Sequence, residues 1–140
     1  MKTRVLFLCT GNSCRSQMAE GFLRARGGGV YEAHSAGTNP STVNPLAVEV
    51  MREIGIDISG QRSKNVTEYL GQHFPFVITV CNNAAEHCPI FPGTSLREHW
   101  PFEDPAEATG TNEERRVLFR KVRDQIGARV QSWIAENTSA

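Results

Sequence analysis

The chain has 140 residues, of which 15 are lysine or arginine and 15 are aspartate or glutamate, so its formal net charge is zero. This length suits one core, and we expect residues 1–140 to form a single domain. The charge balance argues against nucleic acid or an anionic membrane as a partner, although a local anion site is compatible with it.

Strands and helices alternate along the first half of the chain. Residues 4–8 form a nearly continuous apolar run, which is typical of a strand buried on both faces of a parallel sheet. Apolar side chains at helical spacing predict a helix over residues 16–26, stopped by three glycines, and residues 30–36 are expected to form a second strand. An Asn-Pro pair at 44–45 begins a second helix, which we expect to end at Gly55.

The second half continues this alternation. Residues 76–80 are rich in β-branched side chains and predict a third strand, and residues 96–100 predict a short fourth strand. A long amphipathic helix is predicted over residues 112–136. Its inward residues are expected to be Val117, Leu118, Val122, Ile126, Val130 and Trp133. The alternation favours an α/β three-layer sandwich with a central four-stranded parallel sheet.

The cysteines bear on the compartment and the chemistry. The N-terminal apolar run is too short for a secretory signal, and no later run is long enough to span a bilayer. We therefore expect a cytoplasmic protein, acting as a monomer. In that reducing compartment, four cysteines indicate catalysis or metal binding rather than a disulfide framework. Their spacings do not match the short Cys-x2-Cys pairs of structural zinc sites, so we expect no metal.

The stretch "CTGNSCRS", residues 9–16, joins the first predicted strand to the first predicted helix. Ligands of open α/β sheets bind beyond the carboxyl ends of the strands. There the loop delivers successive backbone N–H groups into a helix N-terminus, which favours an anion, and Arg15 adds a planar charged fork. We predict that the whole loop binds a tetrahedral oxyanion through Thr10, Gly11, Asn12, Ser13, Cys14, Arg15 and Ser16.

Cys9 is the candidate nucleophile of this loop. The N–H groups that bind an oxyanion also favour the thiolate form of a cysteine beneath them, and the Ser16 hydroxyl could donate to that sulfur. Gly11 and Asn12 suit the left-handed backbone that such a loop requires. Cys14 has no implied partner, and its side chain is expected only to pack within the loop.

The motifs resemble those of a known family. "VLFLCTGNSCRSQMAEG" is similar to the phosphate-binding loop of the low-molecular-weight protein tyrosine phosphatase superfamily. The segments "SAGT", "IGIDISGQ" and "HWPFEDPA" resemble its arsenate reductase branch, and the match covers nearly the whole chain. The resemblance implies that Cys9 attacks arsenate, that Arg15 and the loop hold the oxyanion, and that phosphate or sulfate competes for the site.

Asp104 is the candidate general acid. The resemblance assigns this role to the residue directly before a proline, and displacing oxide from arsenic does need a proton donor near the leaving oxygen. Asp-Pro is also one of the commonest turn pairs, so the residue could serve structure alone. Glu103 could act instead in principle.

Cys81 and Cys88 favour a reductase over a phosphatase. Cys81 follows the third predicted strand, at the sheet edge where Cys9 lies. Arsenate reduction consumes two electrons, so a second thiol must displace arsenite and leave a disulfide, which a third thiol can carry away. The resemblance to thioredoxin-coupled arsenate reductases gives Cys81 and Cys88 these tasks, with electrons from reduced thioredoxin and no bound cofactor. A phosphatase needs neither, and its usual aromatic residues after Asp-Pro are here Ala106 and Glu107.

Three alternatives remain open on the sequence. The protein could be a phosphatase, an arsenate reductase coupled to glutaredoxin or a small thiol, or an oxyanion-binding module without activity. Cys81 and Cys88 could also be ordinary packed cysteines.

One departure from the family concerns a cation. Some arsenate reductases of this branch bind potassium beside the loop, and Asn12, Glu20 and Ser35 match three of the ligands. The other two positions hold Arg62 and Lys64. We therefore expect no potassium requirement, and Lys64 could supply a positive charge itself.

Overall fold

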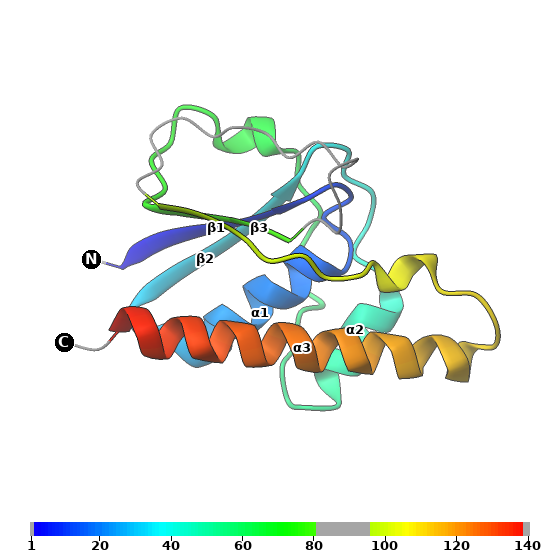
Figure 1. Ribbon diagram of the computed structural model, residues 1–140. Coiled ribbons are helices and arrows are strands. Elements are labelled where there is room, and N and C mark those ends of the chain that lie inside the picture. Colours follow the sequence, from blue (N-terminus) through cyan, green and yellow to red (C-terminus); the bar gives the residue numbers. More distant parts are fainter. Residues whose placement is uncertain (1, 81–95, 139–140) are drawn as a thin grey trace.

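The computed structural model describes residues 2–80 and 96–138. Its centre is a four-stranded sheet in the order β2-β1-β3-β4, and every pairing is parallel (Figure 1). The strands are β1 (Thr3–Cys9), β2 (Tyr31–Gly37), β3 (Phe76–Thr79) and β4 (Leu96–His99). The predicted α/β class with four parallel strands is confirmed.

Three α-helices lie on one face of this sheet, and a short 3-10 helix lies over the other (Figure 1). The α-helices are α1 (Arg15–Gly27), α2 (Pro45–Arg52) and α3 (Asn112–Thr138). The 3-10 helices are η1 (Val66–Tyr69), which covers the opposite face, and η2 (Pro105–Glu107). Asn44 caps α2 by accepting from the Leu46 N–H, as the Asn-Pro pair predicted. The helix ends at Arg52, and the turn that follows it closes at Gly55, whose N–H donates to the Arg52 carbonyl and whose φ is 82°.

The sheet separates two hydrophobic clusters of unequal size. Along β1, Val5 and Phe7 belong to the large cluster under the α-helices, whereas Leu6 and Leu8 belong to the small one under η1. All four side chains are fully buried, which explains why the strand reads as a continuous apolar run. The two-sided burial predicted for this strand is confirmed.

One predicted core position of α3 is wrong. Val117 is 59% exposed, whereas Phe119 is fully buried. Buried residues recur along α3 at 119, 122, 126, 130 and 133, which is the 3- and 4-residue spacing of one helix face. Val117 lies five residues before Val122 and therefore falls on the solvent side.

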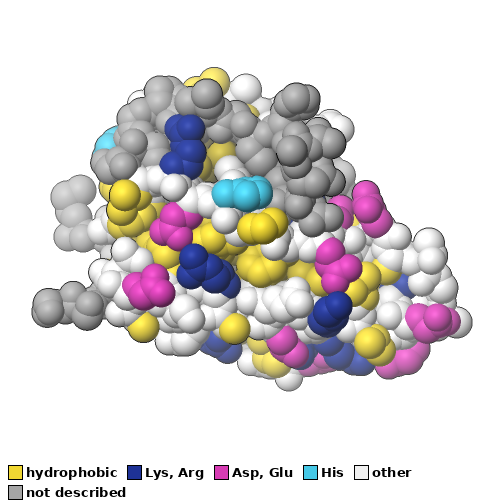
Figure 2. Space-filling model, viewed as in Figure 1, with side chains coloured by type: hydrophobic (Ala, Val, Ile, Leu, Met, Phe, Trp, Pro, Cys, Tyr) yellow, Lys and Arg dark blue, Asp and Glu magenta, His cyan; other side chains and the backbone are white. Residues whose placement is uncertain are grey.

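The charged side chains are spread over the surface in both signs. Figure 2 shows Lys and Arg side chains interspersed with Asp and Glu over the face that includes α3. This agrees with the zero net charge of the sequence. Within the described ranges, no helix combines the length and the hydropathy needed to cross a membrane.

Candidate active site

The loop from Thr10 to Cys14 leaves the carboxyl end of β1 and enters α1. Cys9 is the last residue of β1, where it is paired with Gly37 and is 3% exposed. Arg15 is the first residue of α1, so the loop N–H groups lie at the positive end of that helix. The structure therefore places the predicted nucleophile and the predicted anion site together.

The sulfur of Cys9 is held by two polar groups. Ser16 Oγ lies 2.9 Å from Cys9 Sγ, and the Asn12 N–H donates to the same sulfur at 3.2 Å. The Asn12 side-chain amide donates to Ser16 Oγ at 2.7 Å, which fixes the hydroxyl beside the sulfur. The predicted contact between Ser16 and Cys9 is therefore present. Hydrogen-bond donors next to a sulfur favour its thiolate form in general.

Only one of the two residues expected in a left-handed conformation adopts it. Asn12 has a φ of 48°, whereas Gly11 is not among the residues with positive φ. Asparagine tolerates this conformation better than most side chains because its short amide bonds locally, as it does here to Ser16. The prediction for Gly11 was wrong because a single left-handed residue suffices to turn the loop.

A second segment, residues 38–44, runs along the loop and binds its carbonyl oxygens. The N–H groups of Thr38, Asn39, Ser41 and Asn44 donate to the carbonyls of Cys9, Thr10, Gly11 and Ser13 at 2.9–3.3 Å. With the carbonyls engaged on this outer side, the N–H groups of Gly11, Ser13 and Cys14 have no hydrogen-bond partner within the described part of the chain. They are available to an oxyanion.

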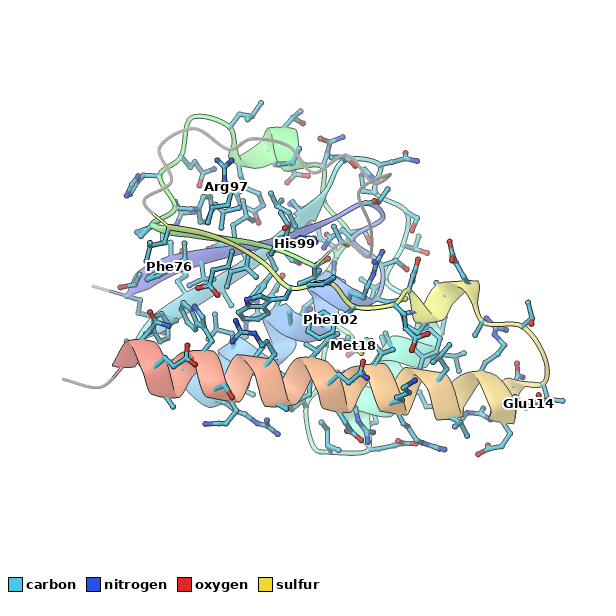
Figure 3. The ribbon with its side chains drawn as sticks, viewed as in Figure 1. Met18, Phe76, Arg97, His99, Phe102 and Glu114 are labelled. Atoms are coloured by element: carbon cyan, nitrogen blue, oxygen red, sulfur yellow. The ribbon has the colours of Figure 1, made fainter. Side chains whose placement is uncertain are left out.

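Arg15 joins the loop to two other segments. Its guanidinium donates to the Val80 carbonyl at 3.4 Å and to the Phe102 carbonyl at 3.2 Å. The same group lies 3.6 Å from the Asp104 carboxylate, while only 4% of the Arg15 side chain is exposed. Figure 3 shows Phe102 in the space between the sheet and α3. Asp104, predicted as the general acid, therefore lies beside the oxyanion loop.

Asp104 also has a structural task. Its carboxylate caps η2 by accepting from the Ala106 N–H at 3.0 Å. This is the turn role that the Asp-Pro pair indicated, and it leaves the Asp104 side chain 28% exposed. One oxygen thus fixes the turn while the other faces Arg15.

The Cys14 thiol is buried, and its surroundings disfavour the thiolate. Its side chain is 2% exposed, and its sulfur lies 3.7 Å from Ser13 Oγ. Burial raises the pKa of the Cys14 thiol to about 12. The expectation that this side chain packs within the loop is confirmed.

Two side chains, of Gln17 and Ser63, and the backbone N–H of Lys64 form a brace that supports Asn12 and that sequence reasoning missed. Gln17 donates to the Asn12 carbonyl at 3.0 Å, and the Ser63 hydroxyl donates to it at 2.6 Å. The Lys64 N–H donates to the Asn12 side-chain oxygen at 2.8 Å. Gln17, a polar residue that is fully buried in α1, is the one member near Asn12 in the chain. Ser63 and Lys64 are 51 and 52 residues from Asn12, so no local sequence pattern could link them to it.

Arg62 and Lys64, which stand where potassium ligands would be needed, lie in different environments. Arg62 is exposed and pairs with Glu68 at 2.6 Å. The Lys64 side chain is 8% exposed, and its Nζ lies 3.6 Å from Glu20 Oε1. Burial lowers the pKa of Lys64, and Glu20 opposes that change. No group of three or more His, Cys, Asp or Glu residues that could hold a metal occurs among the described residues.

Cys81 and Cys88 lie outside the described residues, so their roles stay predictions. Val80, which follows β3, is the residue directly before Cys81. It donates to the Leu8 carbonyl at 2.8 Å and accepts from Arg15. The chain therefore enters the Cys81 segment directly beside the oxyanion loop.

Comparison with known proteins gives concordant results. The sequence profile of the low molecular weight phosphotyrosine protein phosphatase family matches residues 4–139. An arsenate reductase of Shouchella clausii is 50% identical over 132 residues, which cover 94% of this chain and 95% of that protein. The solved structure of an arsenate reductase in the phosphate binding state matches with a TM-score of 0.81 and 39% identity, covering 97% of this chain and 98% of the other.

A second solved structure is that of a thioredoxin-dependent arsenate reductase of Corynebacterium glutamicum. It matches with a TM-score of 0.73 and 27% identity. The match covers 96% of this chain but 61% of that one.

Proposed function

The chain belongs to the low molecular weight phosphotyrosine protein phosphatase family. Because arsenate reductases that are up to 50% identical match it over nearly their whole length, we propose that it reduces arsenate to arsenite. The observation that carries the proposal is the arrangement of Cys9, Arg15 and Asp104 around a loop in which the N–H groups of Gly11, Ser13 and Cys14 are open to an oxyanion. Electrons come from reduced thioredoxin, and no cofactor is bound.

The first step is an attack by Cys9. Arsenate binds in the loop, with its oxygens on the N–H groups of residues 10–16 and on the Arg15 guanidinium. The Cys9 thiolate forms a bond to arsenic(V), and the bond from arsenic to one hydroxyl oxygen of protonated arsenate breaks. Asp104 gives its proton to that hydroxyl, which departs as water.

The next steps move two electrons through three thiols. The Cys81 thiolate attacks the Cys9 sulfur, the sulfur–arsenic bond breaks, and its electron pair stays on arsenic, which leaves as arsenite. Cys88 then attacks Cys81, which releases Cys9 and leaves a Cys81–Cys88 disulfide. Reduced thioredoxin converts this disulfide back to two thiols and is itself oxidised.

The setting of the reaction follows from this chemistry. A cycle that starts with three free thiols requires a reducing compartment, which supports a cytoplasmic location. All the proposed groups lie on one chain, which supports a monomer that needs neither nucleic acid nor membrane. Phosphate and sulfate are expected to compete with arsenate for the loop.

The test is a coupled assay with purified protein, thioredoxin, thioredoxin reductase and NADPH. We expect arsenate-dependent oxidation of NADPH and only weak hydrolysis of p-nitrophenyl phosphate. Strong aryl phosphatase activity without arsenate-dependent oxidation would identify a phosphatase instead, and neither activity would indicate a binding module. Replacing thioredoxin by glutaredoxin and glutathione identifies the electron donor.

Cysteine variants separate the roles. Cys9→Ser removes the nucleophile, so it should abolish arsenate reduction and any phosphatase activity. Cys81→Ser and Cys88→Ser should abolish only the turnover of arsenate. Normal turnover of Cys88→Ser with thioredoxin would show that the proposed cascade is wrong.

A further inference from the structure

The carboxylate of Glu98 joins the edge strand β4 to the helix α3 and has no part in the reaction steps above. It accepts from the indole N–H of Trp100 at 2.9 Å and from that of Trp133 at 3.0 Å. The guanidinium of Arg129 lies 3.3 Å from the same carboxylate and 4.6 Å from the centre of the Trp100 ring. Figure 3 shows the preceding residue, Arg97, on the side of the sheet away from α3, as the alternation of a strand requires.

Both indoles belong to the core, so their N–H groups need an acceptor that lies within the fold. Trp133 is fully buried, and Trp100 is 3% exposed. The ring of Trp133 lies 4.8 Å from that of Tyr31 and 5.0 Å from that of Phe76. A buried N–H group that loses its acceptor is costly, and each oxygen of Glu98 accepts from one of the two indoles. Glu98 therefore fixes both tryptophans between β4 and α3.

The chain that follows Trp100 carries Asp104. The backbone N–H of Trp100 donates to the Thr79 carbonyl at 2.7 Å, which holds this residue beside β3. The Phe102 carbonyl then accepts from Arg15, and Asp104 lies 3.6 Å from the same guanidinium. Asp104 comes four residues after Trp100, so a shift of the tryptophan is passed on to the carboxyl group beside the loop.

We propose that Glu98 is a positioning residue for Asp104: by fixing Trp100 against α3, it sets where residues 100–104 pass the oxyanion loop and so whether the Asp104 carboxyl reaches the leaving oxygen. The proposal rests on the acid step of the proposed function. It assigns to Glu98 an effect on the rate of proton transfer, and not on the binding of the oxyanion, because Glu98 touches neither the loop nor its ligand.

Steady-state kinetics with arsenate, paired with calorimetric titration of inorganic phosphate, tests this inference. Glu98→Gln keeps the size of the side chain, but its single carbonyl oxygen cannot replace both carboxylate oxygens. We expect kcat to fall by about fivefold or more, since a displacement of about 1 Å can cost about 100-fold in rate. Phosphate binding should change by less than about twofold. Trp100→Phe is a second variant with the same expectation, because it removes the indole N–H and keeps an aromatic ring.

Glu32→Gln is the matched control. Glu32 lies on β2, the opposite edge strand of the sheet, and its carboxylate likewise binds a guanidinium and a ring nitrogen, those of Arg4 and His34. This variant makes the same chemical change far along the sheet from Asp104. It should leave kcat within about twofold of the original protein.

A double variant shows whether Glu98 acts through Asp104. In an Asp104→Asn background, Glu98→Gln should change kcat by less than about twofold further, because the group that it positions is already gone. A merely structural role of Glu98 would lower kcat by the same factor in both backgrounds. Unchanged kcat in both Glu98→Gln and Trp100→Phe, an equal loss of phosphate binding, or independent losses in the double variant overturns the inference.

The coupled arsenate assay on the unmodified protein tests the proposed function separately. If the unmodified protein proves to be a phosphatase, the same variants are compared with phenyl phosphate, whose leaving oxygen also needs a proton. A protein with neither activity has no acid step, and that result overturns the inference together with the proposed function.

Discussion

The two cysteines of the loop lie five residues apart and have opposite surroundings. Cys9 Sγ contacts Ser16 and the Asn12 N–H, both of which suit a thiolate. Cys14 Sγ lies in the core, and its contact with Ser13 Oγ is long, at 3.7 Å. Both side chains are nearly fully buried, so what distinguishes the two cysteines is that two polar groups contact Cys9 at short range, whereas the contact of Cys14 with Ser13 is long.

This contrast predicts selective alkylation. In a Cys81→Ser/Cys88→Ser background at pH 8, iodoacetamide should modify Cys9 and leave Cys14 intact, as measured by mass spectrometry. Burial raises the pKa of Cys14 to about 12, so at pH 8 its thiol stays protonated in the folded protein. The unfolded chain loses this proton near pH 8.5, whereas the folded chain keeps it. The free energy of unfolding is therefore unaffected by Cys14 below about pH 8.5 and should fall as the pH rises from there toward 12. Equal modification of both cysteines in the folded protein would contradict the prediction.

Asp104 and Glu103 form a matched pair for testing acid catalysis. Asp104→Asn keeps the cap on η2 but cannot donate a proton as a carboxylic acid does, so kcat for arsenate should fall by about 100-fold or more. Glu103→Gln should leave kcat within about twofold, because Glu103 is exposed and pairs with Lys121 at 3.3 Å. Steady-state kinetics of the two variants measures this difference. Equal losses of kcat in both would contradict the assignment to Asp104.

The buried position of Lys64 also bears on potassium. The Lys64 ammonium group lies 3.6 Å from Glu20, one of the residues that the sequence analysis matched to potassium ligands. Replacing sodium by potassium at fixed ionic strength should therefore change arsenate turnover less than about twofold, since the site already holds a positive charge. A several-fold gain with potassium would show that Lys64 does not fill this role.

At the scale of elements, periodicity was a reliable guide to where strands and helices occur. All seven predicted elements are present, because each buries an apolar face that repeats at the spacing of its backbone. The candidate site was predictable where it is local, at Cys9, Arg15 and Ser16. The segment 38–44 and the brace at Gln17, Ser63 and Lys64 were not, because hydrogen bonds across the fold leave no pattern in the sequence.

The crossing of α1 and α3 depends on a glycine. A Cβ atom at Gly127 would lie 2.8 Å from the ring of Phe22. Gly127→Ala should therefore destabilise the protein by about 1 to 3 kcal/mol through overpacking, although alanine favours a helix by about 1 kcal/mol. Gly29→Ala is the control, since no atom lies within 4 Å of its added Cβ, and it should be nearly neutral. Denaturant unfolding of the two variants measures the difference, and equal stability would refute the packing argument.

At the scale of the whole molecule, the active loop lies at the end of β1, a central strand that borders both hydrophobic clusters. Residues of β1 contribute to the large cluster under α1, α2 and α3 and to the small one under η1. Arg15 adds links to the end of β3 and to the segment that carries Asp104. A ligand in the loop therefore contacts the part of the fold where all of these elements meet.

We accordingly predict that phosphate stabilises the whole protein. At a phosphate concentration 100 times its dissociation constant, the free energy of unfolding should rise by about 2.7 kcal/mol and the melting temperature by about 9 °C. Arg15→Lys should lose most of this increase, because an ammonium group cannot hold two oxygens at once. Scanning fluorimetry with sodium chloride at equal ionic strength is the control. An equal increase with chloride would mean that salt, not the loop, is responsible.

The bonds from segment 38–44 to the loop carbonyls also bear on discrimination between substrates. A loop held in shape before any ligand arrives is preorganised, so capture is fast and demands little rearrangement. The same rigidity gives it little means to separate two tetrahedral oxyanions of similar size and charge. Choice then falls on the step after capture, where arsenic(V) takes an electron pair from a thiol and phosphorus(V) does not. Phosphate leaves unchanged, and its abundance decides how often the loop is vacant when arsenate arrives.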